Sequence, residues 1–309
     1  MKALTATGDR DLIAPSDLPE PTPAPDEAIV QVEAFSVNRG EIFLLTGVYG
    51  TPAEPGRPMG QDVAGRVIRA AADGTGPAVG QRVVGHPAGG GWAERVAVPV
   101  CELAPIPDSV ATTTAAALPL AGLTALRLVR EAGSVLGKRI LVTGASGGVG
   151  HYVVELAVGA GAHVTAVTSS IERGSRLREL GAELITDVHD ATGTYDLVLE
   201  SVGGSSFRAA AALVAQHGTL LWFGQASLEP ITLDFFDLFA NTPITIKHFP
   251  HFVSDVSDAD DLATLVDLVA TGRLHPEIGR IADWADTTTV LDDLNHRRIR
   301  GNAVLTIEG

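Results

Sequence analysis

A glycine-rich turn at residues 145–150, with the spacing Ala-x-Gly-x-x-Gly, constrains the fold more than any other feature of the chain. It follows a short apolar run at 140–142 and opens a helix-like stretch at 149–159. Glycines let the backbone turn sharply and approach a pyrophosphate, and the N-terminus of the following helix offers unpaired N–H groups. Glycines also serve plain packing of a helix on a strand, so the spacing gains its weight from the strand before it and the helix after it. The sequence therefore predicts a βαβ unit with a dinucleotide-binding turn.

Strand-like and helix-like segments alternate through the middle of the chain. After an Ala- and Leu-rich helical stretch at 112–129, we expect strands at 140–142, 163–168, 196–200 and 219–223, and helices at 149–159, 171–180 and 207–214. Such alternation is typical of an α/β domain in which helices cover both faces of a doubly wound parallel sheet.

The first 115 residues have a different texture, with short β-branched runs such as 28–32 and 82–84 between proline- and glycine-rich turns. This pattern predicts an irregular β domain. After a helix at about 258–270, the chain ends in a strand-like run at 303–307, which fits best if it returns to that β domain. We therefore expect two domains: residues 1–115 together with about 272–309, and an inserted nucleotide-binding domain at 116–271.

Composition excludes several classes of function. Lys and Arg number 22 against 37 Asp and Glu, and the formal net charge of −15 repels phosphate backbones and anionic lipid. We expect no nucleic-acid or membrane partner. The first residues reach Asp9 before any apolar stretch of signal-peptide length, and no span of eighteen apolar residues follows, so we expect a cytoplasmic protein. A single cysteine, Cys101, can build neither an internal disulfide nor a zinc site of several thiolates.

The end of the second predicted strand discriminates between the two nicotinamide cofactors. NAD-binding domains usually place an acidic residue there for the ribose 2′-hydroxyl, and the strand at 163–168 has none. Instead Ser169 and Ser170 can donate hydrogen bonds to a 2′-phosphate, and Arg173, in the first turn of the next predicted helix, can pair with its charge. The serines can equally cap that helix. We expect NADPH.

Two families share this glycine spacing. Short-chain dehydrogenases also carry Tyr-x-x-x-Lys, in which the lysine lowers the pKa of the tyrosine. None of the three tyrosines of this chain, Tyr49, Tyr152 and Tyr195, has a lysine four residues later. The turn also lies near residue 145 rather than at the start of the chain. The short-chain alternative fails on both counts.

Over essentially its whole length the chain instead resembles the medium-chain dehydrogenase/reductase superfamily, in the branch of quinone oxidoreductases and enoyl reductases. Besides the glycine-rich turn, the matching segments are Val-Asn-Arg-Gly-Glu at 37–41, Gly-Val-Tyr-Gly at 47–50, Gly-Gln-Asp-Val-Ala-Gly at 60–65, Gly-Trp-Ala-Glu at 91–94 and Ala-Leu-Pro-Leu-Ala-Gly-Leu-Thr-Ala at 117–125. The resemblance implies a GroES-like irregular β-barrel catalytic domain and a Rossmann-type doubly wound domain.

The resemblance also implies a site without metal. Zinc-using relatives have a cysteine where this chain has Asn38, and a histidine in the segment that reads Gly-Gln-Asp at 60–62. Without a Lewis acid, conjugate reduction is easier than alcohol oxidation. As candidate catalytic residues we take Asn38, beside the nicotinamide, and Tyr49, whose context resembles that of the proton-donating tyrosine of some enoyl reductases. Asn38 can also be an ordinary turn residue, and Tyr49 can be a packing residue.

Further cofactor contacts follow from the resemblance. Asn38 and Thr124 are expected at the nicotinamide and its carboxamide, and loops after two strands are expected to line the crevice. Arg39 replaces an aromatic residue or proline of relatives, and Asn302 replaces a lysine. The candidate cofactor-binding residues are Asn38, Thr124, Ser146, Gly147, Gly148, Val149, Ser169, Ser170, Arg173, Val202, Gly203, Phe223, Gly224 and Asn302.

Three hypotheses for function follow. The first is an NADPH-dependent reductase of a quinone or an α,β-unsaturated carbonyl (enone or enoyl) compound. The second is an NADPH-binding structural or regulatory protein with little catalysis, and the third is a tailoring reductase of secondary metabolism, of the polyketide type. The resemblance further implies a homodimer, through pairing of a strand near 244–247 at the sheet edge.

Overall fold

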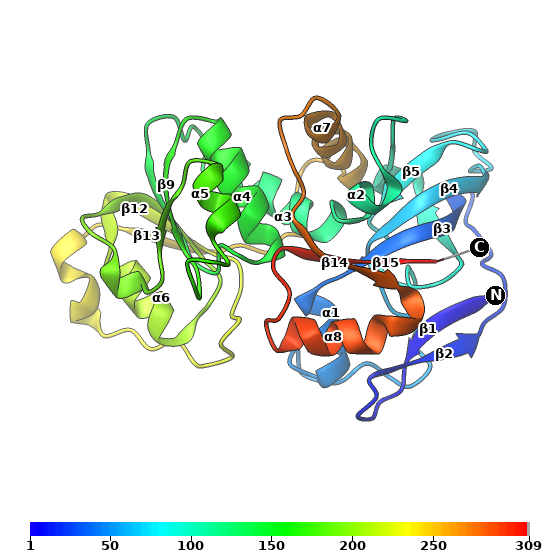
Figure 1. The fold of residues 1–309 in the computed structure, drawn as a ribbon, viewed down its shortest axis with the longest axis horizontal. Helices are drawn as coiled ribbons and strands as arrows, with labels where there is room; N and C mark the ends of the chain where they lie inside the picture. The colour runs from blue at the N-terminus through cyan, green and yellow to red at the C-terminus, as the bar shows by residue number, and fades with distance from the viewer. Residues whose placement is uncertain (308–309) are drawn as a thin grey trace. The chain divides into compact units, whose positions relative to one another are not determined.

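The structure is a computed structural model that describes residues 1–307, apart from the side chains of residues 240 and 241. The chain forms two compact units (Figure 1). Unit 1 comprises Met1–Leu123 and Asp255–Gly309, and unit 2 comprises Thr124–Ser254. The expected α/β fold class, with a β domain and a parallel-sheet domain, is confirmed, and unit 2 lies in sequence between the two segments of unit 1.

Unit 2 is built on a fully parallel sheet with the strand order β10-β9-β8-β11-β12-β13. In chain order this is 3-2-1-4-5-6, the order of Rossmann-type domains. The apolar run at 140–142 forms the centre because Ile140, Leu141 and Val142 are fully buried on both faces. The strands are β8 (Arg139–Val142), β9 (His163–Val167), β10 (Glu183–Ile185), β11 (Tyr195–Glu200), β12 (Val214–Trp222) and β13 (Thr245–His248).

The helices of unit 2 differ in part from the sequence-based expectation. Helix α4 (Gly148–Gly159) lies where it was predicted, whereas the helix predicted at 171–180 is only α5 (Ser175–Glu179), because 171–174 form a turn in which Ser170 Oγ accepts the N–H of Arg173. The helix predicted at 207–214 is α6 (Gly204–Ala211) and begins three residues earlier. Val214 was assigned to that helix, but it starts β12, where it pairs with Tyr195.

Unit 1 is a mainly antiparallel β structure, in which only β14 and β15 pair in parallel among the described strands, and its last strand returns to the first part of the chain, as predicted. The strand order is β14-β15-β3-β4-β5-β7, with β6 also paired to β3 and a separate β1-β2 pair. Strand β15 pairs with β3, with Ala303 opposite Val37. The strands are β1 (Lys2–Ala6), β2 (Ile13–Asp17), β3 (Glu27–Val37), β4 (Val63–Arg69), β5 (Arg82–Gly85), β6 (Arg95–Pro99), β7 (Leu103–Pro105), β14 (Ile278–Asp283) and β15 (Asn302–Thr306).

The core of unit 1 forms around β3. Phe35 and Trp92 stack with ring centroids 5.8 Å apart, and the indole N–H of Trp92 donates to the carbonyl oxygen of Ser36 at 3.1 Å. This bond holds the indole directly behind the residues that precede Asn38. The helices of this unit are α1 (Arg39–Thr46), α2 (Thr112–Ala116), α7 (Asp258–Ala270) and α8 (Thr287–Asn295), and α3 (Pro119–Glu131) begins in it and continues into unit 2.

Helix α7 belongs to unit 1. It packs against β5, β7 and the short helix η1 (Val100–Glu102), and its Leu262 and Leu265 are fully buried. The expected boundaries, 1–115 with about 272–309 against 116–271, placed this helix in the nucleotide-binding domain. The observed division differs because the apolar face of α7 covers strands of the β unit.

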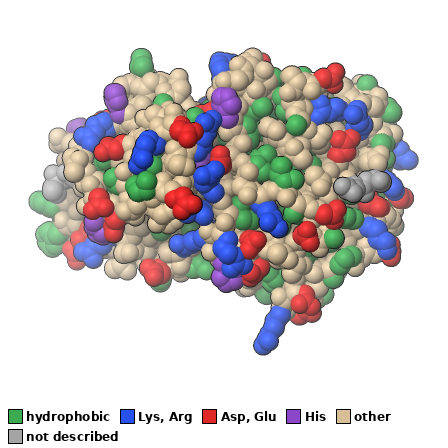
Figure 2. All heavy atoms as spheres, viewed as in Figure 1, with side chains coloured by type: hydrophobic (Ala, Val, Ile, Leu, Met, Phe, Trp, Pro, Cys, Tyr) green, Lys and Arg blue, Asp and Glu red, His purple; other side chains and the backbone are tan. Residues whose placement is uncertain are grey.

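The surface charges and the hydropathy of the helices can be compared with what the composition predicted. Acidic and basic side chains are interspersed on the face shown in Figure 2. Within residues 1–307, no helix combines the length and the apolar character that a membrane span needs.

Candidate active site

The glycine-rich turn connects the end of β8 to α4. Gly144 has φ +62°, and a Cβ there would lie 2.6 Å from Ser201 Oγ. A Cβ on Gly150 would lie 2.5 Å from the carbonyl oxygen of Ala145, so this glycine lets α4 pack closely on the turn. The N-cap residue is Gly147, and no side chain caps the helix. The first N–H groups of α4 are therefore not capped by a side chain, which is the arrangement that favours anion binding at a helix N-terminus.

A buried carboxylate ties this turn to the neighbouring strand. Glu200, at the end of β11, accepts the hydroxyl of Thr143 at 3.1 Å and the backbone N–H groups of Val202 and Gly203 at 3.0 Å. Burial raises the pKa of Glu200, and the backbone N–H groups of Gly203 and Val202 lower it in part. In the order 3-2-1-4-5-6, β8 and β11 flank the switch point where open α/β sheets bind dinucleotides.

The predicted 2′-phosphate residues gather beside the same turn. Arg173 Nε lies 3.4 Å from Ser146 Oγ, and the backbone N–H of Arg173 donates to Ser170 Oγ at 3.2 Å. Ser170 therefore serves local capping, and its hydroxyl hydrogen remains able to donate to a ligand. Ser169 is exposed next to this group. The structure thus brings Ser146, Ser170 and Arg173 together.

The remaining candidates of unit 2 follow the ends of β11 and β12. Val202 and Gly203 are held by Glu200, and Phe223 donates its N–H to the Glu200 carbonyl oxygen at 2.9 Å. The Gly224 carbonyl oxygen accepts the indole N–H of Trp222 at 2.6 Å. These residues therefore lie at the carboxyl ends of neighbouring strands, as expected.

The candidates of unit 1 are organised by Asp62, a fully buried residue that was not predicted as a site residue. Its Oδ2 accepts the amide of Asn38 at 2.8 Å and the hydroxyl of Ser36. Its Oδ1 lies 3.1 Å from His86 Nδ1 and accepts the backbone N–H of Leu120 at 3.0 Å. One carboxylate thereby joins the end of β3, the end of β5 and the start of α3.

This network fixes the orientation of Asn38. Its amide nitrogen donates to Asp62 and also contacts Ser36 Oγ at 3.2 Å, so both amide hydrogens are engaged. Asn38 is also the N-cap of α1 and forms a capping box with Glu41, whose Oε2 accepts the Asn38 N–H at 2.8 Å. Asn38 is therefore a capping residue of α1, as the turn interpretation expected, while its side-chain amide is held by Asp62.

Two further ionisable groups surround Asp62. Burial and, next, the charge of Asp62 raise the pKa of Glu41 to about 8, so this carboxyl is neutral at pH 7. Within residues 1–307 its Oε1 has no hydrogen-bond partner. Burial lowers the pKa of His86, but the hydrogen bond and charge of Asp62 outweigh it, and the net shift is upward.

Tyr49 lies beside the start of α1. Its ring packs edge-on against Phe43 at 5.8 Å between centroids, and its hydroxyl lies 3.6 Å from the position of a Cβ on Gly40. Burial and the nearby Glu41 raise the pKa of the Tyr49 hydroxyl, which therefore keeps its proton at neutral pH. With 67% of its surface exposed, Tyr49 is not a core residue.

Asn302 and Thr124 are the two remaining candidate residues. Asn302 is buried, and its backbone N–H and its side-chain amide both donate to the carbonyl oxygen of Glu277, at 2.8 and 3.1 Å. Thr124 is buried on α3, one turn after Leu120, whose N–H binds Asp62. Because residues four apart share a helix face, Thr124 lies on the same face of α3 as Leu120, one turn further along the helix.

Sequence reasoning missed Ser36, Glu41, Asp62, His86 and Glu200. Asp62 and Glu41 lie in segments that match the family, and the Asn-x-x-Glu spacing of Asn38 and Glu41 is a capping-box signal. His86 is only 8% exposed, and its Nδ1 lies 3.1 Å from Asp62 Oδ1. Within residues 1–307, no group of three His, Cys, Asp or Glu side chains is placed to hold a metal ion.

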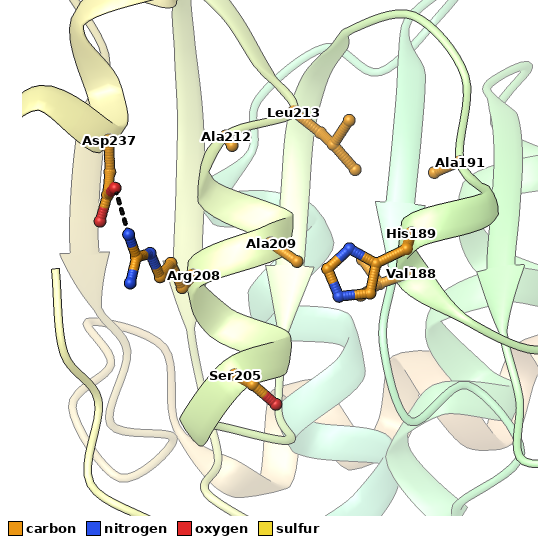
Figure 3. A pocket seen from close by; sticks show the side chains of 9 residues that line it. All are labelled: Val188, His189, Ala191, Ser205, Arg208, Ala209, Ala212, Leu213 and Asp237. Atoms are coloured by element: carbon orange, nitrogen blue, oxygen red, sulfur yellow. Dashed lines mark hydrogen bonds and ion pairs between the residues drawn. The ribbon is translucent and has the colours of Figure 1, made fainter.

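A separate depression of about 420 Å³ lies on unit 2 along the outer side of α6 (Figure 3). Arg208 pairs there with Asp237 at 2.6 Å, and Leu213 and His189 lie across from them. None of the candidate site residues lines this depression.

Comparison with known proteins gives the family. Residues 24–108 match the model of the alcohol dehydrogenase GroES-like domain, and residues 148–271 match the model described as zinc-binding dehydrogenase. The chain is 35% identical to the chloroplast envelope quinone oxidoreductase homolog of Arabidopsis thaliana, over 66% of this chain and 68% of that protein. It is 31% identical, over 83% of its length, to a segment that makes up 13% of the mycocerosic acid synthase-like polyketide synthase of Mycolicibacterium smegmatis.

Among solved structures, a mycobacterial protein in complex with NADPH superposes with a TM-score of 0.89. It is 27% identical, and the match covers 99% of this chain and 100% of that one. Fold, motif order and these likenesses agree: the chain belongs to the medium-chain dehydrogenase/reductase superfamily, in its quinone oxidoreductase branch.

Proposed function

We propose that the protein is an NADPH-dependent oxidoreductase that transfers a hydride, without a metal, to a quinone or an α,β-unsaturated carbonyl compound. The observation that carries the proposal is the anion site at the switch point of the parallel sheet. There the uncapped N-terminus of α4 lies beside Arg173 and Ser146. The NADPH complex of the mycobacterial relative and the name of the Arabidopsis relative support the cofactor and the class of acceptor.

The residues of the chain have defined tasks in this proposal. Bound NADPH would supply the hydride. The α4 N-terminus would hold the pyrophosphate, and Arg173, Ser169 and Ser170 the 2′-phosphate. Reduction leaves negative charge on the acceptor's oxygen, and the protonated hydroxyl of Tyr49 would donate there. Asn38, with both amide hydrogens engaged, would offer only its oxygen to the nicotinamide end.

The metal-free part of the proposal rests on donor chemistry. Where zinc-using relatives have a cysteine, this chain has an asparagine whose amide is bound to Asp62. Gln61, in place of the histidine, offers an amide, which is a poor zinc ligand. Metal analysis of the purified protein tests this directly, and we expect a zinc content far below one ion per chain. Activity should also be unaffected by a chelator.

Turnover is the first test. The protein would be mixed with NADPH and a panel of quinones, enones and enoyl thioesters, and the loss of NADPH absorbance followed. We expect turnover with at least one class of acceptor. Tight NADPH binding without turnover of any acceptor would contradict this function and favour an NADPH-binding structural or regulatory protein.

Cofactor choice is tested by Arg173→Ala, with Arg176→Ala as the control. Arg176 lies on the neighbouring helix turn and pairs with Glu179 on the surface at 3.1 Å. A charge-assisted hydrogen bond to phosphate contributes about 1.5–3 kcal/mol, so the Kd for NADPH should rise about tenfold or more while that for NADH stays unchanged. An unchanged NADPH-to-NADH preference would show that the 2′-phosphate site lies elsewhere.

The substitution Tyr49→Phe distinguishes a proton-donating role of Tyr49 from a packing role. If Tyr49 is the proton donor, the substitution should lower kcat by about 10²-fold or more and remove the alkaline limb of the pH profile of kcat. As a packing residue it should change kcat less than about twofold. Phe43→Leu, which removes the ring contact but leaves the hydroxyl, provides the matched control.

A second candidate is a tailoring reductase of the polyketide type. The likeness to a segment of the polyketide synthase supports it, since that segment spans most of this chain. Enoyl thioesters of phosphopantetheine and free quinones should then differ in kcat/KM, with the thioesters preferred. We also retain two proposals from the sequence: a homodimer paired through the edge strand β13, testable by sedimentation, and a cytoplasmic location, testable by fractionation of cells.

A further inference from the structure

Hydrogen bonds around Glu200 fix the loop that follows β11. Four groups donate to its fully buried carboxylate: the hydroxyls of Thr143 and Ser206, at 3.1 and 3.2 Å, and the backbone N–H groups of Val202 and Gly203, both at 3.0 Å. These five residues form the Glu200 clasp. Because every other member donates, both carboxylate oxygens act only as acceptors, which is the behaviour of an ionised carboxylate. Two of the donors belong to the loop itself, so Glu200 orders the backbone next to it.

The loop at 201–203 is also bound to its neighbours on two sides. Ser201 donates its N–H to Thr143 Oγ1 at 3.0 Å and its hydroxyl to the Thr143 carbonyl oxygen at 3.1 Å, directly before the glycine-rich turn. On the other side, the carbonyl oxygen of Val202 accepts the N–H of Ser227, beyond the end of β12, at 2.8 Å. The loop therefore connects the carboxyl ends of β8 and β12, the two strands that flank β11.

The place of this loop in the sheet assigns it to one end of a dinucleotide. A sheet of the order 3-2-1-4-5-6 consists of two mononucleotide-binding halves that meet at the switch point. The half formed by β8, β9 and β10 carries Ser146, Ser170 and Arg173, the proposed contacts of the 2′-phosphate at the adenosine end. The loop after β11 belongs to the other half, so we expect it at the nicotinamide end.

We propose that Glu200 is a positioning residue for the nicotinamide end of the cofactor: its carboxylate, tied to Thr143, holds Val202 and Gly203 in the shape that receives this end. The proposal deepens the proposed function and rests on it for the site at which NADPH binds. A loop that is ordered before binding loses less entropy on binding, so breaking the clasp should lower the affinity without removing a cofactor contact. Glu200 is fully buried and therefore acts through the loop.

Two ligands separate the two ends of the cofactor site. NADPH spans both ends, whereas adenosine 2′,5′-bisphosphate carries only the adenosine end with its 2′-phosphate. The Kd of each ligand is measured with the full chain, by fluorescence titration for NADPH and by calorimetry for the bisphosphate.

The variants keep the shape of the side chains that they replace. Glu200→Gln removes the charge of the clasp, and Thr143→Val removes one hydroxyl, which Thr143→Ser retains. Thr165→Val is the matched control, because Thr165 is a buried threonine of the adjacent strand β9 whose hydroxyl donates to Glu183 at 3.3 Å, outside the clasp.

We expect the Kd for NADPH to rise about tenfold in Glu200→Gln and about threefold in Thr143→Val, while the Kd for the bisphosphate changes less than about twofold. Thr143→Ser and Thr165→Val should bind both ligands like the wild type. An equal rise of both constants would show a merely structural role and overturn the proposal, as would unchanged NADPH binding in both clasp variants. A selective loss of NADPH affinity, in a protein that turns over no acceptor, would support the clasp and refute the proposed function alone.

Discussion

Each unit buries a carboxylate among its own candidate residues, but the two units build the surroundings of that carboxylate in different ways. Glu200 in unit 2 is satisfied mainly by its own loop, through the N–H groups of Val202 and Gly203. Asp62 in unit 1 is satisfied by segments far apart in the chain, including Ser36, His86 and Leu120. Unit 2 thus forms its site from local backbone geometry, whereas unit 1 assembles its site from side chains.

The difference has an energetic side. A carboxylate held by backbone N–H groups at the start of a helix is compensated by the fold itself. Around Asp62, by contrast, compensation comes mostly from side chains, with the backbone N–H of Leu120 as an exception, and one neighbour, Glu41, is left protonated with an unpartnered oxygen. The electrostatics of unit 1 should therefore respond more strongly to mutation and to pH than those of unit 2.

The largest effect should come from Asp62→Ala. The substitution strands the amide of Asn38, the hydroxyl of Ser36 and the Leu120 N–H inside the protein, which should reduce the free energy of unfolding by about 3–5 kcal/mol. Asp17→Ala is the control, because Asp17 pairs with Lys2 at 2.7 Å on the surface, where such a pair contributes about 0–1 kcal/mol. Urea unfolding measures both, and similar losses would contradict the contrast between the units.

A smaller effect should appear as a pH dependence that belongs to Glu41. Its pKa is raised from an ordinary 4.5 to about 8, so between these values the folded protein binds a proton that the unfolded chain has lost. Stability from this group is therefore full below about pH 4.5 and falls as the pH rises, by about 2–3 kcal/mol from pH 6 to pH 8.

Glu41→Gln isolates this dependence, because glutamine keeps the capping box and does not titrate. Unfolding free energies of the variant should decline less than those of the wild type over this interval, and the remaining decline belongs to groups such as His86, whose pKa is also raised. Equal slopes for the two proteins would mean that Glu41 is ionised when folded. Glu200→Gln, measured over the same pH range, sharpens the comparison between the units.

The smallest effect should come from unit 2. Gly144→Ala places a Cβ at φ +62° and 2.6 Å from Ser201 Oγ, a strain of about 1–3 kcal/mol that should raise the Kd for NADPH about tenfold. Gly159→Ala is the matched control at the end of α4, where a Cβ meets no atom within 4 Å. Binding is measured by fluorescence titration, and parallel behaviour of the two variants would remove the glycine-rich turn from the cofactor site.

Sequence reasoning reached the parts of this molecule that depend on local spacing. The glycine-rich turn, β8 and α4 followed from glycine positions and apolar runs. The last strand was expected to return to the first β domain, and the fold shows that its partner there is β3. The prediction of a helix at 171–180 was wrong in its first part. Residues 171–174 have helix-like sequence spacing, but they form a turn held by Ser170, and the helix covers only Ser175–Glu179. The apolar face of α7 shows that this helix packs, but only the fold shows that it packs on β5 and β7.

The candidate site divides in the same way. Ser146, Ser170 and Arg173 were all predicted to contact the cofactor and lie together, because they follow the carboxyl ends of the neighbouring parallel strands β8 and β9. The partnership of Asp62 with His86 and Asn38 spans 24 residues in each direction along the chain, and no local pattern encodes it. Side-chain networks that join distant segments become visible only when the fold is known.

The pairing of β15 with β3 sets an order of events for a chain made from its N-terminus. The pairing of Val37 with Ala303 can form only after β15 has been synthesised, so the sheet of unit 1 stays incomplete until that strand leaves the ribosome. Thr124–Ser254 is contiguous and can fold while the remainder is still being synthesised. The exposed edge of β3 is meanwhile open to chaperones or to wrong partners, and a stalled or truncated product would present a finished nucleotide unit on an unfinished β unit.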